Sequence, residues 1–558
     1  MKKIDRSGIL ALISLHIFLS SEVNAGQVTY SVGVDTDLVK QEVTTEDDDA
    51  QFDVNNQVIV PYLFVNYAGP KLSLQGRASN NHIRRDLNDE SVSQNYAEYN
   101  YSGRYQIVDT LFSLNANGSQ RYLSDRIESF DVDDFLLNSD NLGKLNASAI
   151  SANLNLPRGD YFGLTLQSRY SKSEFERDIE DTTPVNSFFD NESFGTSFTL
   201  TSGTDVTGVR VNLTGSATEL KRQSRQDFIS QSLNASVDIN LYKNIALAIN
   251  GFYENNEIKT ETDSEIDGLN EFYSAGLGLI YQLGQERFVE IAYNRSKTEA
   301  RSGLEDEEND FVSLQFAWAL TNRTNVQGEY TRRFYGDAAS FRFNHNLRNW
   351  RSSIRYNETV NSQSQLISVT EPGLLLCEEG VVDLSECTLS DSLEPELGDE
   401  QFIVPINVQG VDINDRIVIR KSLTAQTAVT RRRTVFSIIG QRSQTEELEV
   451  ERLIDNYSLR TSLAFDISKK SVLEFGHTFS KVEQDRAGDL GTQISNEYSI
   501  ELARKLSRKF TTSLMFSYLN RNGEIDIFDN EFRGLNGPLT DRRITFRISY
   551  QLANGRFR

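Results

Sequence analysis

The stretch Val312-Ser-Leu-Gln-Phe-Ala-Trp-Ala-Leu320 alternates between two kinds of side chain. Large apolar residues occupy every second position, while the intervening positions hold only serine, glutamine and alanine. Successive side chains of a β-strand point to opposite faces, so this stretch predicts a strand with one apolar face and one small or polar face. The apolar face suits lipid, and the other face suits a wet interior.

The same period of two recurs along the whole chain, for example from Leu233, Tyr457 and Ile544 onward. Counting gives about 24 alternating segments, an even number, as in single-chain bacterial barrels. Most of them have about 10 residues or more, which is what a tilted strand needs to cross the hydrocarbon, whereas strands in globular proteins average about 5 to 6. The expected segments are 27–38, 57–67, 72–84, 93–103, 107–122, 145–156, 161–175, 191–202, 207–220, 230–241, 245–258, 271–283, 287–299, 309–320, 324–336, 339–347, 350–365, 415–428, 434–445, 455–467, 471–483, 496–506, 509–521 and 542–552.

Short turns, such as 68–71 and 468–470, alternate with longer acidic loops, such as 305–310. Outer-membrane barrels have short periplasmic turns and longer extracellular loops. The sequence therefore predicts an all-β fold, a large antiparallel transmembrane β-barrel with long acidic extracellular loops. One tight connection, 336–339, is predicted to lie outside. A soluble β-solenoid or a string of sandwiches is the alternative, and the length of the segments disfavours it.

Residues 1–25 have the pattern of a secretory signal peptide: a basic start, an apolar run and a small-residue cleavage signal ending at Ala25. We therefore expect 1–25 to be removed and 26–558 to form the barrel in the outer membrane of a Gram-negative bacterium, among its lipid and lipopolysaccharide. The mean hydropathy of −0.45 argues only against a helical membrane protein, because a barrel strand is apolar at alternate positions.

Charge argues against a nucleic-acid partner. The chain has 57 basic and 80 acidic residues, of which 1–25 contain 3 and 2, so 26–558 carry 54 − 78 = −24.

The positions opposite the apolar phase predict the side chains that face the lumen. Five arginines fall on three consecutive segments or on the turn between two of them, where they would form a positive wall: Arg342, Arg348, Arg351, Arg355 and Arg420. Other inward charges are Arg77, Arg169, Arg210, Arg460, Arg547, Glu98, Asp238, Glu290, Glu329, Glu474 and Glu501. These charges either pair to hold the barrel in shape, or the arginine wall binds a polyanion, because guanidinium groups fit carboxylates and phosphates.

Cys377 and Cys387 lie ten residues apart within a long loop, 366–414, which is predicted to plug the barrel or to form a surface element. In an oxidising compartment we expect them to form a disulfide. No metal-ligand cluster, Ser/His/acid spacing or phosphate loop appears in the sequence, so we expect no metal, no cofactor and no enzymatic activity.

The stretches 335–343 and 350–358, with His345 between them, together with 502–506 and 58–70, resemble the PEP-CTERM system-associated outer-membrane protein family. That resemblance implies a large outer-membrane barrel associated with exopolysaccharide production and with protein sorting through exosortase. It implies no functional residue.

Three functions are compatible with these observations. The first is a channel for exopolysaccharide export, with an acidic exopolysaccharide and periplasmic export components as partners. The second is a structural or surface-attachment barrel that holds glycan or a partner outside the cell. The third is a general porin for small solutes.

Overall fold

The computed structural model describes residues 26–45, 51–87, 90–108, 110–124, 136, 142–176, 190–222, 227–259, 271–284, 287–299, 307–362, 370–378, 388–389, 401–409, 417–447, 452–486, 489–507, 509–524 and 538–557. The predicted signal peptide, 1–25, lies outside these ranges. Among the described residues, no helix is long and apolar enough to cross a membrane.

The strands of the first half of the chain follow one another with short gaps. They are β1 (Gln27–Thr45), β2 (Gln51–Ala68), β3 (Leu72–Leu87), β4 (Glu90–Val108), β5 (Phe112–Ser124), β6 (Leu142–Leu156), β7 (Phe162–Glu176), β8 (Asn191–Ser202), β9 (Val209–Arg222), β10 (Asp227–Tyr242), β11 (Ile245–Lys259), β12 (Glu271–Gly284) and β13 (Arg287–Glu299).

The second half continues the same series, with one insertion. Its strands are β14 (Glu307–Thr321), β15 (Thr324–Arg333), β16 (Gly336–Leu347), β17 (Trp350–Ser362), β18 (Thr370–Glu378), β19 (Thr388–Leu389), β20 (Gln401–Gln409), β21 (Ile417–Arg431), β22 (Thr434–Glu447), β23 (Arg452–Ser468), β24 (Ser471–Arg486), β25 (Asp489–Lys505), β26 (Phe510–Glu524) and β27 (Leu539–Phe557).

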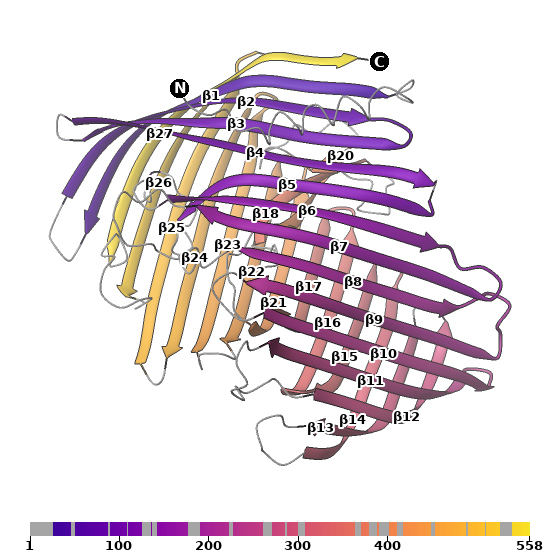
Figure 1. The fold of residues 1–558 in the computed structure, drawn as a ribbon. Helices are drawn as coiled ribbons and strands as arrows, with labels where there is room; N and C mark the ends of the chain where they lie inside the picture. Colours follow the sequence, from indigo (N-terminus) through magenta and orange to yellow (C-terminus); the bar gives the residue numbers. More distant parts are fainter. Residues whose placement is uncertain are drawn as a thin grey trace.

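All but three of these strands form one closed sheet of 24 strands (Figure 1). Each barrel strand pairs antiparallel with the next one along the chain, and β17 pairs with β21 across the insertion. The last strand, β27, pairs with β1, so the yellow and indigo ends of the chain lie side by side in Figure 1. The remaining strands, β18, β19 and β20, form a separate sheet. The predicted barrel and its strand number are confirmed.

Polar contacts hold the seam between β1 and β27. Arg547 donates two hydrogen bonds to the carboxylate of Asp37, from Nε at 2.8 Å and from an Nη at 2.9 Å. Further along the seam, the Gln41 amide donates to Asp541 at 3.2 Å and accepts from Asn56 at 3.0 Å. These contacts fix the register at which the barrel closes.

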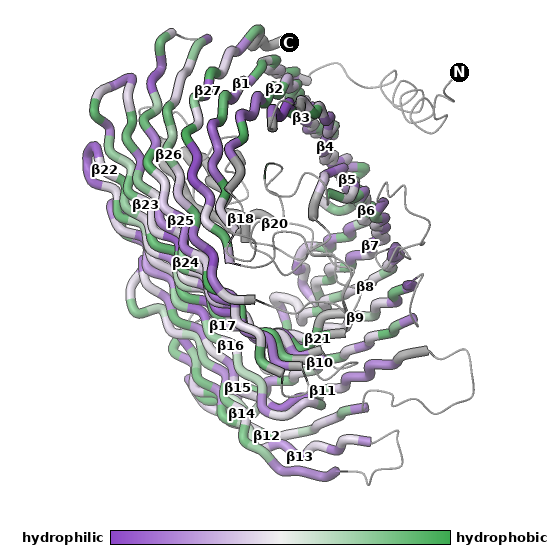
Figure 2. Tube along the Cα trace, turned by 90° about the vertical axis from the view of Figure 1, so that its left-hand side faces the viewer, coloured by the Kyte–Doolittle hydropathy of each residue, from purple (hydrophilic) through white to green (hydrophobic). Residues whose placement is uncertain are grey.

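The outer face of the wall is apolar. Large exposed residues occupy alternate positions of one strand after another, for example Leu277 and Leu279 on β12, and Leu459 and Leu463 on β23. Figure 2 shows this alternation as green and purple along the strands of an elongated ring. Exposed apolar side chains all around a closed wall are what lipid requires of a transmembrane barrel.

The strands extend further than the alternation predicted. β1 runs to Thr45 and β4 begins at Glu90, whereas the predicted segments ended at 38 and began at 93. The reason is that backbone pairing continues beyond the lipid, where both faces are polar and the period of two disappears. The tight outer connection lies at 334–335, not 336–339, because β16 already begins at Gly336, whose φ of 114° suits glycine.

An introduced charge should cost far more stability on the lipid face than on the lumen face. Ile500 on β25 is exposed on the apolar face, and its neighbour Ser499 faces the other way. We expect Ile500→Arg to lower the free energy of unfolding by about 2 to 4 kcal/mol, because arginine is then placed in lipid. Ser499→Arg is the matched control and should have a much smaller effect. Denaturant unfolding in lipid vesicles measures both, and equal losses would contradict the assignment of faces.

Candidate functional site

The face opposite the apolar belt lines the interior of the barrel. Arg333 on β15 contacts Glu254 on β11 although β12, β13 and β14 lie between these strands in the sheet. Asn250 on β11 likewise donates to Glu290 on β13 at 2.5 Å. Strands that are not neighbours can touch only across the concave side of a sheet, so these side chains mark the lumen.

The register carries this assignment around the wall, because directly paired residues share a face. Glu290 pairs with Gln315, and Gln315 with Glu329. Two residues from Glu329, Gln327 pairs with Arg342, and Arg342 pairs with Arg355. Following the register further places these predicted inward charges on the lumen face: Arg77, Arg169, Arg210, Arg351, Arg420, Arg460, Arg547, Glu98, Asp238, Glu474 and Glu501.

The wall folds sharply at β12. Gly276 and Gly278 point no side chain into the lumen there, and a Cβ on Gly276 would lie 1.9 Å from Oδ1 of Asn294. A Cβ on Gly278 would lie 2.7 Å from the Cβ of Ala292. These glycines let β11 and β13 approach each other, and a small cluster of Ala246, Ala248 and Ile280 packs at the fold. Figure 2 shows β12 and β13 at one narrow end of the ring.

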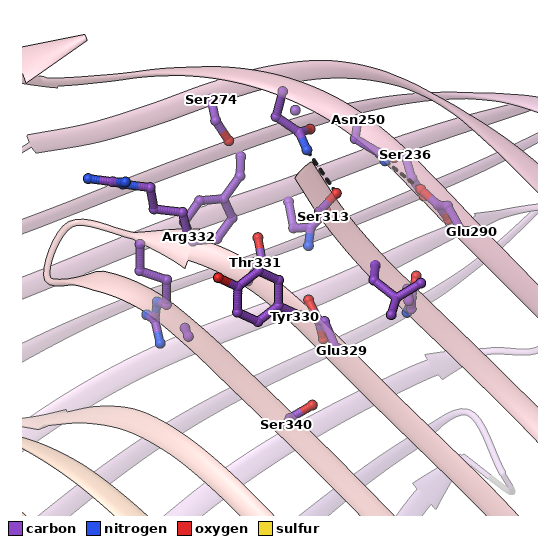
Figure 3. Close-up of a pocket in the computed structure, with 18 of the residues that line it drawn as sticks. Ser236, Asn250, Ser274, Glu290, Ser313, Glu329, Tyr330, Thr331, Arg332 and Ser340 are labelled. Carbon is purple, nitrogen blue, oxygen red and sulfur yellow. Dashed lines mark hydrogen bonds between the residues drawn. The ribbon is translucent and has the colours of Figure 1, made fainter. Parts of the chain in front are cut away.

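A polar pocket of about 580 Å³ lies beside this fold, on the lumen face of β9 to β17. Its carboxylates are Asp238, Glu290, Glu329 and Glu358, and its arginines are Arg210, Arg332 and Arg333. Figure 3 shows Glu290 close to Asn250, with Glu329 on the neighbouring part of the wall. Arg210 contacts Asp238 at 3.4 Å. The narrow end of the lumen is therefore acidic and partly neutralised.

The contact between Arg333 and Glu254 closes this end toward the outside. Arg333 donates from Nε at 3.0 Å and from an Nη at 2.6 Å to the two oxygens of Glu254. The Glu254 side chain is 3% exposed and that of Arg333 is 22% exposed. Arg333 also lies over the Tyr335 ring at 5.5 Å. This pair could not be predicted from the sequence, because three strands and 79 residues separate its members.

The predicted arginine wall takes the form of a column on β16, β17 and β21. Arg342 and Arg355 face each other on adjacent strands. Arg351 lies four residues from Arg355 on β17, toward the periplasmic turn, and Arg420 pairs with Thr359, four residues from Arg355 in the other direction. Arg348 lies in the turn between β16 and β17, so the register assigns it no face. We call Arg342, Arg348, Arg351, Arg355 and Arg420 the arginine column.

The column differs from other lumen arginines in its partners. Arg210 and Arg547 have carboxylate partners, Asp238 and Asp37. Among the residues that the structure describes, Arg342, Arg355 and Arg420 have none. Pairing of charges therefore explains the arginines of the narrow end and of the seam, but not Arg342, Arg355 and Arg420.

The lumen is packed at its outer end and more accessible toward the middle of the wall. Lumen-facing residues near the outer ends of the strands, including Phe228 and Phe272, are fully buried. In contrast, Arg342 and Arg355 are exposed. The middle of the column therefore lies in the accessible part of the lumen, while Arg351 and Arg420 are half-buried.

Two predictions fall on parts of the chain that the structure leaves undescribed. Cys387 lies outside the described ranges, and the side chain of Cys377 on β18 is not described, so their disulfide stays a prediction. The same holds for the predicted role of 366–414. In the described residues, no group of three or more histidine, cysteine, aspartate or glutamate side chains is arranged to hold a metal ion.

No protein-family model matches the chain, and no curated protein matches it. Among solved structures it is similar to the siderophore receptor PirA from Pseudomonas aeruginosa, with a TM-score of 0.35 and 11% identity over 93% of this chain and 80% of that one. The chain is also similar to PirA from Acinetobacter baumannii, with a TM-score of 0.39 and 9% identity over 95% of this chain and 81% of that one. For OmpT, an outer membrane protein of Vibrio cholerae, the TM-score is 0.23 and the identity is 8%, over 67% of this chain and 100% of that one. We draw no functional argument from likenesses this weak.

The closed wall, the apolar outer face and the polar lumen define this protein as an outer-membrane β-barrel.

The buried pair at the narrow end is open to a direct test. Glu254→Ala leaves Arg333 as a largely buried charge without its carboxylate, so we expect the free energy of unfolding to fall by about 3 to 5 kcal/mol. The control is Glu308→Ala, which removes the exposed contact with Arg295 and should cost less than about 1 kcal/mol. Denaturant unfolding compares them. Similar losses for both variants would show that the pair does not hold the narrow end closed.

Proposed function

We propose that this barrel is a conduit through which an acidic exopolysaccharide crosses the outer membrane. The arginine column supports this proposal most directly. Four of its members lie on the lumen face, and the fifth, Arg348, lies in a periplasmic turn. From Arg351 to the level of Arg420 the column spans two steps of four residues, which is about 26 Å along a strand. At a strand tilt of about 40° this is about 20 Å of height, most of the apolar band of a barrel, which is about 25 Å tall.

The column is electrostatically unfavourable when no anion is present. Arg342 and Arg355 are directly opposite each other, and like charges at such positions destabilise a sheet. A carboxylate or phosphate group between two guanidinium groups would relieve this repulsion and would accept hydrogen bonds from both. A chain that carries one anionic group after another could move from one arginine to the next, because conduction requires several binding sites that are each weak enough to release the ion.

The acidic narrow end would keep such a chain on the arginine side of the lumen. Asp238, Glu290 and Glu329 lie on β10, β13 and β15, while the column occupies β16, β17 and β21. A polyanion is repelled by the first group and attracted by the second. The lumen therefore offers one favourable track, and transport along it requires no catalytic group.

The wider setting of this proposal includes the PEP-CTERM system and periplasmic export components, as the resemblance of 335–358 implies. We propose a passive channel with no enzymatic activity, surrounded by lipid and lipopolysaccharide.

One observation favours a second candidate, a surface-attachment barrel that holds glycan or a partner outside the cell. The lumen-facing side chains at the outer ends of the strands are buried, Phe228 and Phe272 completely. A barrel that is packed at its outer end could act as a rigid base for surface segments. A general porin, the third candidate, is disfavoured because its lumen would need no accumulation of arginines such as Arg342 facing Arg355.

Conductance through a planar bilayer separates these candidates. We expect steady conductance that an acidic polysaccharide blocks. Arg342→Gln/Arg355→Gln removes two charge-assisted contacts with the polysaccharide, which together should contribute about 1.4 kcal/mol to its binding. The block should therefore weaken about tenfold. The measurement is the blocking concentration of the polysaccharide for each protein.

Arg169→Gln/Arg460→Gln is the matched control for this experiment. It removes two lumen arginines that lie on β7 and β23, outside the column. We expect its block to stay near that of the wild type. An equal loss for both double variants would mean that net lumen charge, and not the column, attracts the polyanion. A folded but silent barrel would favour surface attachment.

Removing the insertion between β17 and β21 tests the surface-attachment hypothesis independently. Ser362 and Ile417 are register partners at the ends of β17 and β21, so a short glycine-containing turn can replace 363–416 without moving either strand. A conduit should keep its block by the polyanion after this replacement. If instead cells lose surface glycan while the purified barrel keeps its conductance and block, attachment through the insertion explains the glycan better.

A further inference from the structure

The periplasmic rim of the barrel is basic along one side. Successive short turns from β14 to β24 carry arginine or lysine: Arg323 between β14 and β15, Arg348 between β16 and β17, Arg432 and Arg433 between β21 and β22, and Lys469 and Lys470 between β23 and β24. Arg431 ends β21 at the same level. These turns are neighbours around the rim, because the strands they join are consecutive in the sheet. We call these residues the basic arc.

The side chains of the basic arc are available for binding. Each of them is exposed. Within the described part of the chain, no carboxylate forms an ion pair with any of them, and the turns themselves contain no aspartate or glutamate. Elsewhere on the rim, the β6–β7 and β8–β9 turns carry exposed Asp160 and Asp205, and single exposed cations are present at Lys71, Arg158, Lys243 and Lys509. The basic arc is therefore the part of the described rim where exposed cations are most numerous.

We propose that the basic arc binds the anionic polysaccharide at the periplasmic mouth and delivers it to the arginine column. This inference rests on the proposed function and adds a loading site outside the lumen. Arg348 belongs to both sets and is three residues from Arg351, so the cations of the rim continue into the lumen. Cations spread along one side of the mouth raise the local concentration of a polyanion and orient it toward the column.

The uneven distribution of cations favours a polyanion over lipid headgroups as the occupant. Phospholipids surround the rim on all sides, so headgroup binding would call for cations spread evenly around it. Most of the exposed cations in the described turns instead lie between β14 and β24, and the column on β16, β17 and β21 lies within that part. The position of the column therefore predicts which side of the rim is basic.

Binding to purified barrels in phosphatidylcholine nanodiscs tests this directly. The probe is a fluorescent oligogalacturonate, a linear chain of carboxylate-bearing sugars. We expect Lys469→Gln/Lys470→Gln to weaken binding about fivefold at about 0.1 M salt, because two exposed ionic contacts are lost. At about 1 M salt, where the Debye length falls to about 3 Å, the difference from wild type should disappear.

The control variant is Lys71→Gln/Lys243→Gln, which removes the same charge from exposed positions of the rim outside the basic arc. It should bind the probe as the wild type does. Equal binding by the wild type and by Lys469→Gln/Lys470→Gln would overturn the proposal, and so would an equal loss in the control variant. If Lys469→Gln/Lys470→Gln changes only the amount of phosphatidylglycerol that co-purifies with the barrel, the basic arc binds headgroups and the proposal is wrong.

The lumen is tested separately in the same assay. If Arg342→Gln/Arg355→Gln binds as the wild type does while Lys469→Gln/Lys470→Gln does not, the basic arc stands and the conduit through the column fails. If Arg342→Gln/Arg355→Gln alone loses binding, the column stands and the basic arc fails. Loss in both variants supports a continuous path from the mouth into the lumen.

Discussion

The hydrogen-bonding demand of the peptide backbone in lipid determines this structure. A backbone N–H or C=O group without a partner costs several kcal/mol in the hydrocarbon, so a sheet can cross it only if no edge remains. Here β27 returns to β1 and the seam pairs over the full length of both strands, from Val28 with Phe557 to Thr45 with Leu539. The bidentate contact between Asp37 and Arg547 lies on the lumen side of that seam, where water can reach it.

Closure of the barrel also determines which side chains face lipid and which face the lumen. In a closed wall every residue of a strand faces either lipid or the lumen, and a shift of one residue would exchange the two sets. Apolar residues such as Leu279 and Leu463 fix the choice, because lipid accepts them and rejects their charged neighbours. The position of Arg355 in the lumen is therefore a consequence of the apolar residues on either side of it, Ile354 and Tyr356.

Strand number and facing could be predicted from the sequence, because both depend on the local period of two. The ends of the strands could not, since pairing continues past the lipid where the pattern stops, as at Thr45. The fold of the wall at β12 could not be predicted either. Gly276 and Gly278 signal a close approach, but local sequence does not say which strands approach. The contact between Arg333 and Glu254 follows from that fold and was missed with it.

The charged groups of the lumen have two different roles. At the seam and the narrow end, opposite charges pair and hold the wall, as Arg547 does with Asp37 and Arg333 with Glu254. Along β16, β17 and β21, arginines accumulate instead, and Arg342 and Arg355 are neighbours of the same sign. Both roles were considered from the sequence. Register and partners now assign each role to its own part of the wall, and the accumulation of charge supports the proposed transport of a polyanion.

The most direct test of this account is the reactivity of single cysteines along β17, placed one at a time from 351 to 356 in a chain without its native cysteines. Reaction with an anionic, membrane-impermeant thiol reagent and with its cationic counterpart is measured in lipid vesicles. We expect rapid reaction at 351, 353 and 355, protection at 352, 354 and 356, and faster reaction at 353 with the anionic reagent than with the cationic one. Reaction at the even positions, or no preference for the anionic reagent at 353, would contradict an arginine column in an aqueous lumen.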